Sequence, residues 1–115
     1  MIKKYKISVP KSTLNNINKK VKNYPWKMIE KLNGWEYGTN YNFLKKISRY
    51  WVSKYNWKKF ENKINSFKNY KTNVDGINLH FIKEKSKNPK SRPLLLLHGW
   101  PGSVIEFFDI IPRLA

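Results

Sequence analysis

Residues 94–103 read Leu-Leu-Leu-Leu-His-Gly-Trp-Pro-Gly-Ser, and this stretch decides the fold class. The four apolar residues from Leu94 to Leu97 are typical of a short strand that is covered on both faces of a sheet. The glycines and the proline that follow predict a tight turn. Beyond the turn, Ser103 and Glu106 have the spacing of a capping box. Apolar residues then recur at helical spacing, at Val104, Phe107, Phe108, Ile111 and Leu114. A buried strand, a loop and one helix, as in an α/β sheet, are therefore expected here.

The loop after the predicted strand places backbone N–H groups near a helix N-terminus, where they can stabilise a developing negative charge. Gly99 and Gly102 permit backbone conformations that other residues avoid, and Pro101 can adopt the cis form that tight turns favour. We expect the fold to aim the N–H of Trp100, and one such donor is worth on the order of 3 kcal/mol in a barrier. We interpret His98 as a ring that braces this loop by hydrogen bonding.

The sequence offers no complete catalytic or metal-binding set. It has no cysteine, two histidines and no Gly-x-Ser-x-Gly motif. Ser103 is better explained as a helix cap than as a nucleophile, and His80 lies inside a predicted strand. Two histidines without a spaced carboxylate do not make a metal site. We therefore predict no catalytic residue, no metal and no cofactor in this chain.

Upstream, the spacing of apolar residues predicts three helices. Alternation over residues 5–9 indicates a short extended segment that ends at Pro10. Ser12 or Thr13 is the expected N-cap of a first helix. Residues 33–40 have the composition of a loop, and Thr39 or Asn40 is expected to start a second helix. The expected apolar positions are Leu14, Ile17 and Val21 in the first helix, Tyr41, Leu44, Ile47 and Trp51 in the second, and Trp57, Phe60 and Ile64 in a short third.

The period changes near residue 70. Residues 71–75 and 77–82 read as the two strands of a hairpin with Asp75-Gly76 at its turn. Residues 83–92 are expected to form a charged surface loop. We therefore divide the chain into a helical region, residues 1–69, and the start of an α/β core, residues 70–115.

The chain of 115 residues carries a formal net charge of +17. Such a charge favours a nucleic-acid interaction, but 21 of the 24 basic residues are Lys and three are Arg. Arg is the residue preferred for bidentate phosphate contacts, so we do not expect nucleic acid as a partner. The N-terminus lacks the apolar core of a signal peptide, and residues 94–97 are too few to span a membrane. A cytoplasmic protein without a membrane interaction is expected.

Several motifs along the chain resemble the N-terminal region of microsomal-type epoxide hydrolases, which belong to the α/β-hydrolase superfamily. The His98–Ser103 run with Glu106-Phe107-Phe108 behind it is similar to that family's oxyanion loop and the helix that follows. Other matches occur upstream in the expected order. They are Gly34-Trp35-Glu36-Tyr37-Gly38-Thr39, Tyr50-Trp51, Tyr55-Asn56-Trp57, Asn65-Ser66-Phe67, Asp75-Gly76 and His80-Phe81-Ile82. The resemblance covers nearly the whole chain.

The resemblance implies the fold and part of a mechanism. In the family an Asp nucleophile attacks the epoxide and forms an ester, a His with an acidic partner activates the water that hydrolyses it, and two lid Tyr assist ring opening. Of these groups, only the oxyanion-hole position maps onto this chain, at the backbone N–H of Trp100. His98, Gly99, Pro101 and Gly102 would shape the loop. The expected substrate in a full-length context is a small-molecule epoxide.

The family's sheet order implies that the strand at residues 94–97 does not pair with the hairpin, because a later strand lies between them. We therefore expect an incomplete sheet and a chain that is inactive alone. Two alternatives stay open: half of a split hydrolase that assembles with a C-terminal hydrolase half, and a basic nucleic-acid-binding module.

Overall fold

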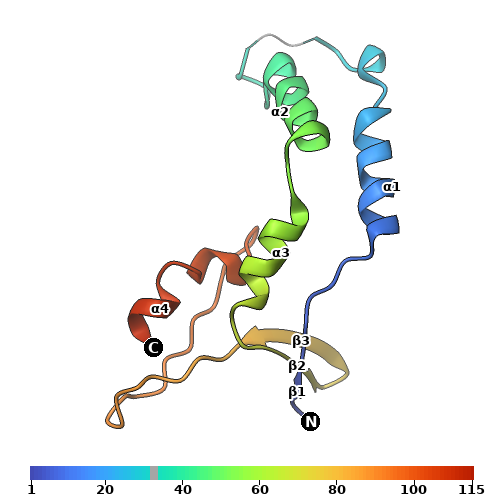
Figure 1. Ribbon diagram of the computed structural model, residues 1–115. Coiled ribbons are helices and arrows are strands. Elements are labelled where there is room, and N and C mark those ends of the chain that lie inside the picture. The colour runs from blue at the N-terminus through green and yellow to red at the C-terminus, as the bar shows by residue number, and fades with distance from the viewer. Residues whose placement is uncertain (32–33) are drawn as a thin grey trace. The chain divides into compact units, whose positions relative to one another are not determined.

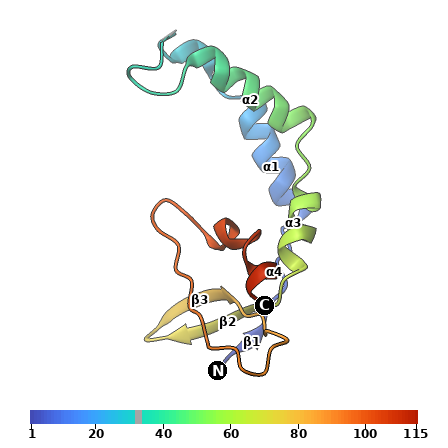
Figure 2. The same cartoon turned by 90° about the vertical axis from the view of Figure 1, so that its left-hand side faces the viewer.

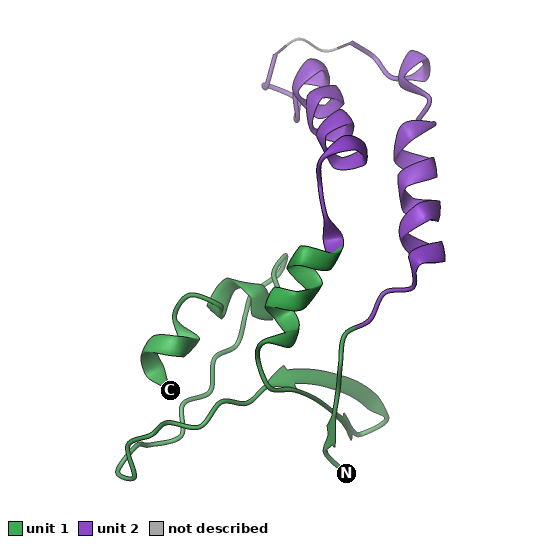
Figure 3. Ribbon diagram, viewed as in Figure 1, with its two compact units in different colours: residues 1–7, 58–115 green, residues 8–57 purple. Residues whose placement is uncertain are grey.

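The computed structural model describes residues 1–31 and 34–115 (Figure 1). These residues form two compact units, which Figure 3 distinguishes by colour. One unit comprises residues 8–57, and the other comprises residues 1–7 and 58–115. Residue 33, the first of the predicted loop at 33–40, lies outside the described residues.

The unit of residues 8–57 contains two helices, α1 (Lys11–Lys22) and α2 (Tyr41–Ser53), with a short 3-10 turn, η1 (Trp26–Met28), between them. The predicted cap of α1 was wrong: the helix begins at Lys11, directly after Pro10, and no side chain caps it. Proline takes this place because its fixed φ suits a helix start. Of the two residues expected to start α2, Thr39 and Asn40, the second is the cap, since the Asn40 side chain accepts a hydrogen bond of 3.0 Å from the N–H of Phe43.

The helices α1 and α2 pack against each other, but not through the whole predicted apolar stripe of α2. Tyr41 is buried, and its hydroxyl donates to the Trp26 carbonyl at 3.2 Å. The other three stripe residues remain 39–43% exposed; they are Leu44, Ile47 and Trp51. The side chains of α2 that lie toward α1 come from Lys45, Ser48 and Val52 instead.

The unit of residues 1–7 and 58–115, labelled unit 1 in Figure 3, contains α3 (Trp57–Asn65, whose first residue belongs to unit 2) and a three-stranded antiparallel sheet of order β1-β2-β3. The hairpin of β2 (Asn69–Val74) and β3 (Ile77–Ile82) is confirmed, with β2 starting two residues earlier than predicted. Asp75 and Gly76 have φ of 49° and 83°, as a two-residue hairpin turn requires.

The N-terminal segment pairs earlier than predicted. Strand β1 is Lys3–Lys4, with Lys3 opposite Lys71 on β2, whereas the extended segment was expected at residues 5–9. Tyr5 adds one further ladder bond, from its N–H to the Asn69 carbonyl at 2.9 Å. The backbone of Ile7 then exchanges two bonds, of 2.9 and 2.7 Å, with the side chain of Asn65 on α3. The N-terminal segment leaves the sheet at this point, because the backbone N–H and carbonyl of Ile7 bond to the Asn65 side chain instead of to a strand.

The predicted strand at residues 94–97 does not form. The whole stretch from residue 83 to residue 103 runs without helix or strand, and Figure 2 shows it as a long orange connection after β3. Leu94, Leu95 and Leu97 are 66%, 79% and 79% exposed. A strand is stabilised by its ladder, and none of the described segments pairs with this one. The charged surface loop predicted at residues 83–92 is confirmed.

The single helix predicted after the loop is also wrong. A 3-10 turn, η2 (Val104–Phe107), and a four-residue helix, α4 (Ile111–Leu114), take its place. Pro112 lies within the first two positions of α4. Proline lacks an N–H and its ring clashes with the carbonyl four residues earlier, so a regular helix cannot run unbroken through residue 112.

Candidate functional site: the loop at residues 98–103

The loop is held at its C-terminal end by the capping box predicted from the sequence. The N–H of Ser103 donates to Glu106 Oε1 at 3.2 Å, and Ser103 Oγ accepts from the N–H of Ile105 at 3.4 Å. The first turn of η2 therefore has side-chain partners for its backbone groups.

Phe108 anchors the segment behind the loop to the rest of its unit. Its ring is 4% exposed and stacks on Phe67 with centroids 4.7 Å apart, and Phe60 lies 6.4 Å away on α3. Lys63 Nζ lies 5.8 Å from the centre of the same ring. Among the described residues, Phe108 is one of three buried apolar side chains, together with Tyr41 and Ile64. A buried aromatic side chain therefore fixes the helix end of the loop.

The two glycines of the loop, Gly99 and Gly102, differ in how much space surrounds their Cα atoms. Neither Gly99 nor Gly102 has φ in the left-handed region, so the predicted conformational reason was wrong for both. A Cβ on Gly102 would collide with the carboxylate of Glu106 and lie 2.9 Å from the carbonyl oxygen of Gly99. Gly102 is thus required by close approach, while a Cβ on Gly99 would meet open space.

Trp100 and His98 lie on the exposed side of the loop. The bond between Trp100 and Pro101 is cis, as the sequence allowed, and the indole of Trp100 is 98% exposed. Throughout residues 1–31 and 34–115, no hydrogen bond is made by the N–H of Trp100. His98 Nδ1 lies 3.0 Å from the carbonyl oxygen of Gly99, which is a contact within the loop itself. The amide of Trp100 is therefore available to an outside acceptor.

A second polar cluster, which the sequence analysis missed, joins the sheet to α3. Asn69 is 5% exposed, and its Nδ2 donates to the carbonyls of Ile64 at 2.9 Å and Phe67 at 2.7 Å. Its Oδ1 lies 3.0 Å from Nε2 of His80. Because Asn69 already uses its amide hydrogens, we assign Nε2 of His80 as the donor. His80 is therefore structural, and the signal for Asn69 was its place just after a helix C-terminus.

Burial, and to a lesser degree the Lys71 ammonium opposite on β2, lower the pKa of His80 from its usual 6.5. Both causes disfavour the imidazolium form. The neutral ring matches the donor role assigned above, and neither His80 nor His98 has a carboxylate partner among the contacts of the described residues. Residues 1–31 and 34–115 contain no group of three or more His, Cys, Asp or Glu that could hold a metal ion.

Comparison with known proteins shows which family the chain belongs to. The profile described as "Epoxide hydrolase N terminus" matches residues 2–107. The chain belongs to this family. The predicted resemblance is therefore confirmed, and so is the fold class, because the solved structures that the chain matches are epoxide hydrolases.

Among solved epoxide hydrolases, the juvenile hormone epoxide hydrolase of the silkworm Bombyx mori matches with a TM-score of 0.89 and 33% identity, over 99% of this chain and 28% of that one. The enzyme of Aspergillus niger matches with a TM-score of 0.83 and 27% identity, over 98% of this chain and 30% of that one.

Curated relatives agree with the structural matches. Juvenile hormone epoxide hydrolase 1 of Ctenocephalides felis is 38% identical over 99% of this chain and 25% of its own length. Epoxide hydrolase 1 of Oryctolagus cuniculus is 35% identical over 99% of this chain and 26% of its own length. The chain thus spans about a quarter of the curated epoxide hydrolases that it matches. None of the described helices is long and apolar enough to cross a membrane.

Proposed function

We propose that this chain supplies the N-terminal portion of an enzyme that hydrolyses small epoxides to diols through an ester intermediate. Its chemical contribution is the backbone N–H of Trp100, which donates to the oxyanion that forms when the ester is hydrolysed. The nucleophile, the water-activating His with its acidic partner, and the lid tyrosines belong to the remaining portion of the hydrolase. Family membership and the quarter of the relatives' length that the chain spans support this division of labour.

The observation that carries the proposal is the unbonded amide of Trp100 on a loop that is anchored from behind. The capping box and the stacked ring of Phe108 hold the loop's helix end, and Gly102 allows its tight approach to Glu106. A preorganised donor stabilises a charge as it develops without reorganising at that moment. His98 and Pro101 are proposed to shape the loop, whereas nothing around Gly99 requires a glycine.

The exposed apolar surface of unit 1 supports association with the remaining portion of the hydrolase. A groove of about 910 Å³ lies along β3, residues 94–98 and the residues of η2 and α4. Leu94, Leu95 and Leu97 along this groove are more than 60% exposed. Exposed apolar patches of this kind mark association sites. In this proposal the sheet is completed by strands of the hydrolase core, and the domain boundary between residues 69 and 70 stays a prediction, as does a cytoplasmic location.

The proposal is tested with a chimera of the Bombyx mori enzyme, in which residues 1–115 replace the matched N-terminal portion. Diol formation from an aryl epoxide is measured for the chimera, for the parent enzyme and for the 115-residue chain alone. We expect turnover by the chimera and none by the isolated chain. A chimera that folds but forms no diol, or an isolated chain that turns over epoxide, would contradict the proposal.

A further inference from the structure

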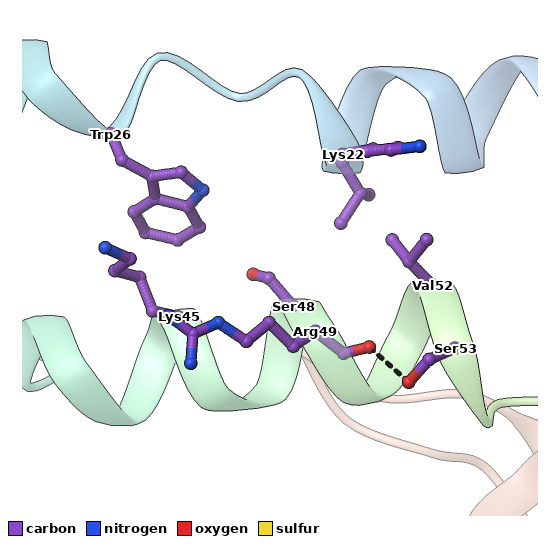
Figure 4. A pocket seen from close by; sticks show the side chains of 8 residues that line it. Lys22, Trp26, Lys45, Ser48, Arg49, Val52 and Ser53 are labelled. Carbon is purple, nitrogen blue, oxygen red and sulfur yellow. Dashed lines mark hydrogen bonds between the residues drawn. The ribbon is translucent and has the colours of Figure 1, made fainter.

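The two helices of unit 2, residues 8–57, enclose a groove that the function above does not use. It has a volume of about 410 Å³ and lies between α1 and α2 (Figure 4). This volume falls within the usual range for sites that hold small organic molecules. The apolar lining comes from Trp26, whose ring points toward α2, and from Val21 and Val52.

The groove also contains three cationic side chains, of Lys22, Lys45 and Arg49. Neither α1 nor α2 contains an acidic residue, and the ion pairs of the described residues include none of the three cations. Lys45 is only partly exposed, and its Nζ lies 5.3 Å from the centre of the Tyr41 ring. The positive charge of the groove is therefore uncompensated by any carboxylate of these two helices.

The orientation of α2 is unusual for a helix that packs on another helix. Its apolar side chains at Leu44, Ile47 and Trp51 stay two-fifths exposed, while Lys45 and Ser48 lie toward α1. A packing interface normally turns the apolar stripe inward. The side of α2 that lies toward α1 carries Lys45 and Ser48 beside the apolar Val52, which suits a space that receives a ligand with a charged part and an apolar part.

We propose that this groove binds a small organic anion with a flat apolar body and one carboxylate or phosphate group. The apolar body lies against Trp26, Val21 and Val52, and the acidic group lies between Lys45 and Arg49 with Lys22 at the rim. Arg49 offers a planar fork that matches a carboxylate or a phosphate. Charge complementarity selects the acidic group, and the indole ring selects a flat body. This inference is independent of the proposed hydrolase function.

The test uses the full chain and 2-naphthoate as the probe, with neutral 2-naphthamide and inorganic phosphate as comparison ligands. Calorimetry gives affinities, and amide NMR shifts locate the ligand. We expect saturable binding of 2-naphthoate, with the largest shifts at Val21, Trp26, Ser48 and Val52. Weaker binding of 2-naphthamide and of inorganic phosphate is expected, because each lacks one of the two recognised features.

Matched substitutions separate this site from general attraction to a basic protein. Lys45→Gln and Arg49→Gln are each expected to weaken 2-naphthoate binding about fivefold, since each removes one partly exposed charge contact. Lys46→Gln removes the same charge from the neighbouring residue of α2, which does not line the groove, and is expected to leave the affinity unchanged. Circular dichroism checks that each variant keeps its helices. Equal binding of 2-naphthamide, equal weakening by Lys46→Gln, or no saturable binding would overturn the proposal.

Discussion

At the residue scale, Asn69 is the side chain on which the stability of unit 1, residues 1–7 and 58–115, depends most clearly. It joins the end of α3 to the sheet through three short contacts and is almost fully buried. Asn69→Ala is expected to lower the free energy of unfolding by about 2–3 kcal/mol, because it removes the donor to the Phe67 carbonyl, one of two donors to the Ile64 carbonyl and the acceptor of His80 Nε2. Urea unfolding measures the loss. Asn78→Ala, at an exposed position of the same hairpin, is the control and should cost under about 0.5 kcal/mol. Equal losses in the two variants would show that the cluster is not structural.

His80 makes stability depend on pH. Its pKa is lowered in the folded state by burial and by Lys71, so the unfolded chain binds more protons near its usual value of 6.5. The free energy of unfolding must then rise with pH in this range, and the stabilisation present above 6.5 is lost as the pH falls below it. In the wild type, the urea midpoint is expected to be higher at pH 7.5 than at pH 5.5. In His80→Gln the two midpoints are expected to converge. His98→Gln is the control, and an unchanged pH dependence in His80→Gln would refute this assignment.

At the element scale, η2 and α4 are held to the rest of unit 1 chiefly by the ring of Phe108. Phe108→Ala is expected to destabilise this contact by about 3–4 kcal/mol, because it removes a buried aromatic side chain and leaves a cavity. Hydrogen exchange should then report faster exchange of amides over residues 104–114, with the hairpin little changed. Ile110→Ala, at a residue 45% exposed, is the matched control. Uniform loss of protection across the unit would contradict a local role for Phe108.

The unpaired segment at residues 94–97 predicts self-association. Its leucines are exposed and its backbone has no ladder partner among the described segments, which is the arrangement that promotes edge-to-edge pairing. The double substitution Leu95→Lys with Leu97→Lys is expected to shift the chain toward monomer in sedimentation velocity. Its free energy of unfolding should change by less than about 0.5 kcal/mol, since these side chains contribute little to the described core. Ile77→Lys alters a similarly exposed apolar residue on a paired strand, and an equal shift in that variant would contradict the assignment.

At the scale of the whole molecule, features set by neighbours in sequence were predictable and features set by distant partners were not. The Asp75-Gly76 turn, the Asn40 cap and the capping box at Ser103 each depend on a few adjacent residues, and all were predicted correctly. The strand at residues 94–97 failed because a strand needs a ladder that its own composition cannot provide. The prediction of a single helix after the loop was wrong because Pro112 interrupts regular helix geometry near its end.

In the candidate site, too, the features set by sequence neighbours were predictable and those set by distant partners were not. Sequence reasoning identified the loop, because glycine, proline and a helix cap occur together there. It did not identify Asn69, because His80 on β3 meets it only in the folded unit, although its other partners, the carbonyls of Ile64 and Phe67, lie within five residues in sequence. It also placed Leu44, Ile47 and Trp51 on one apolar stripe of the second helix, and the structure leaves all three exposed. Apolar periodicity finds an amphipathic helix but does not say which partner covers its face.

The central claim is that the backbone N–H of Trp100 supplies one oxyanion donor to an epoxide hydrolase. It is tested most directly by replacing the amide between Gly99 and Trp100 with an ester in the active chimera, which deletes this N–H and keeps the indole. Single-turnover kinetics then follow hydrolysis of the ester intermediate. We expect this step to slow by about 100-fold, while Trp100→Phe, which keeps the N–H, loses far less. Unchanged hydrolysis in the chimera that carries the ester would contradict the claim.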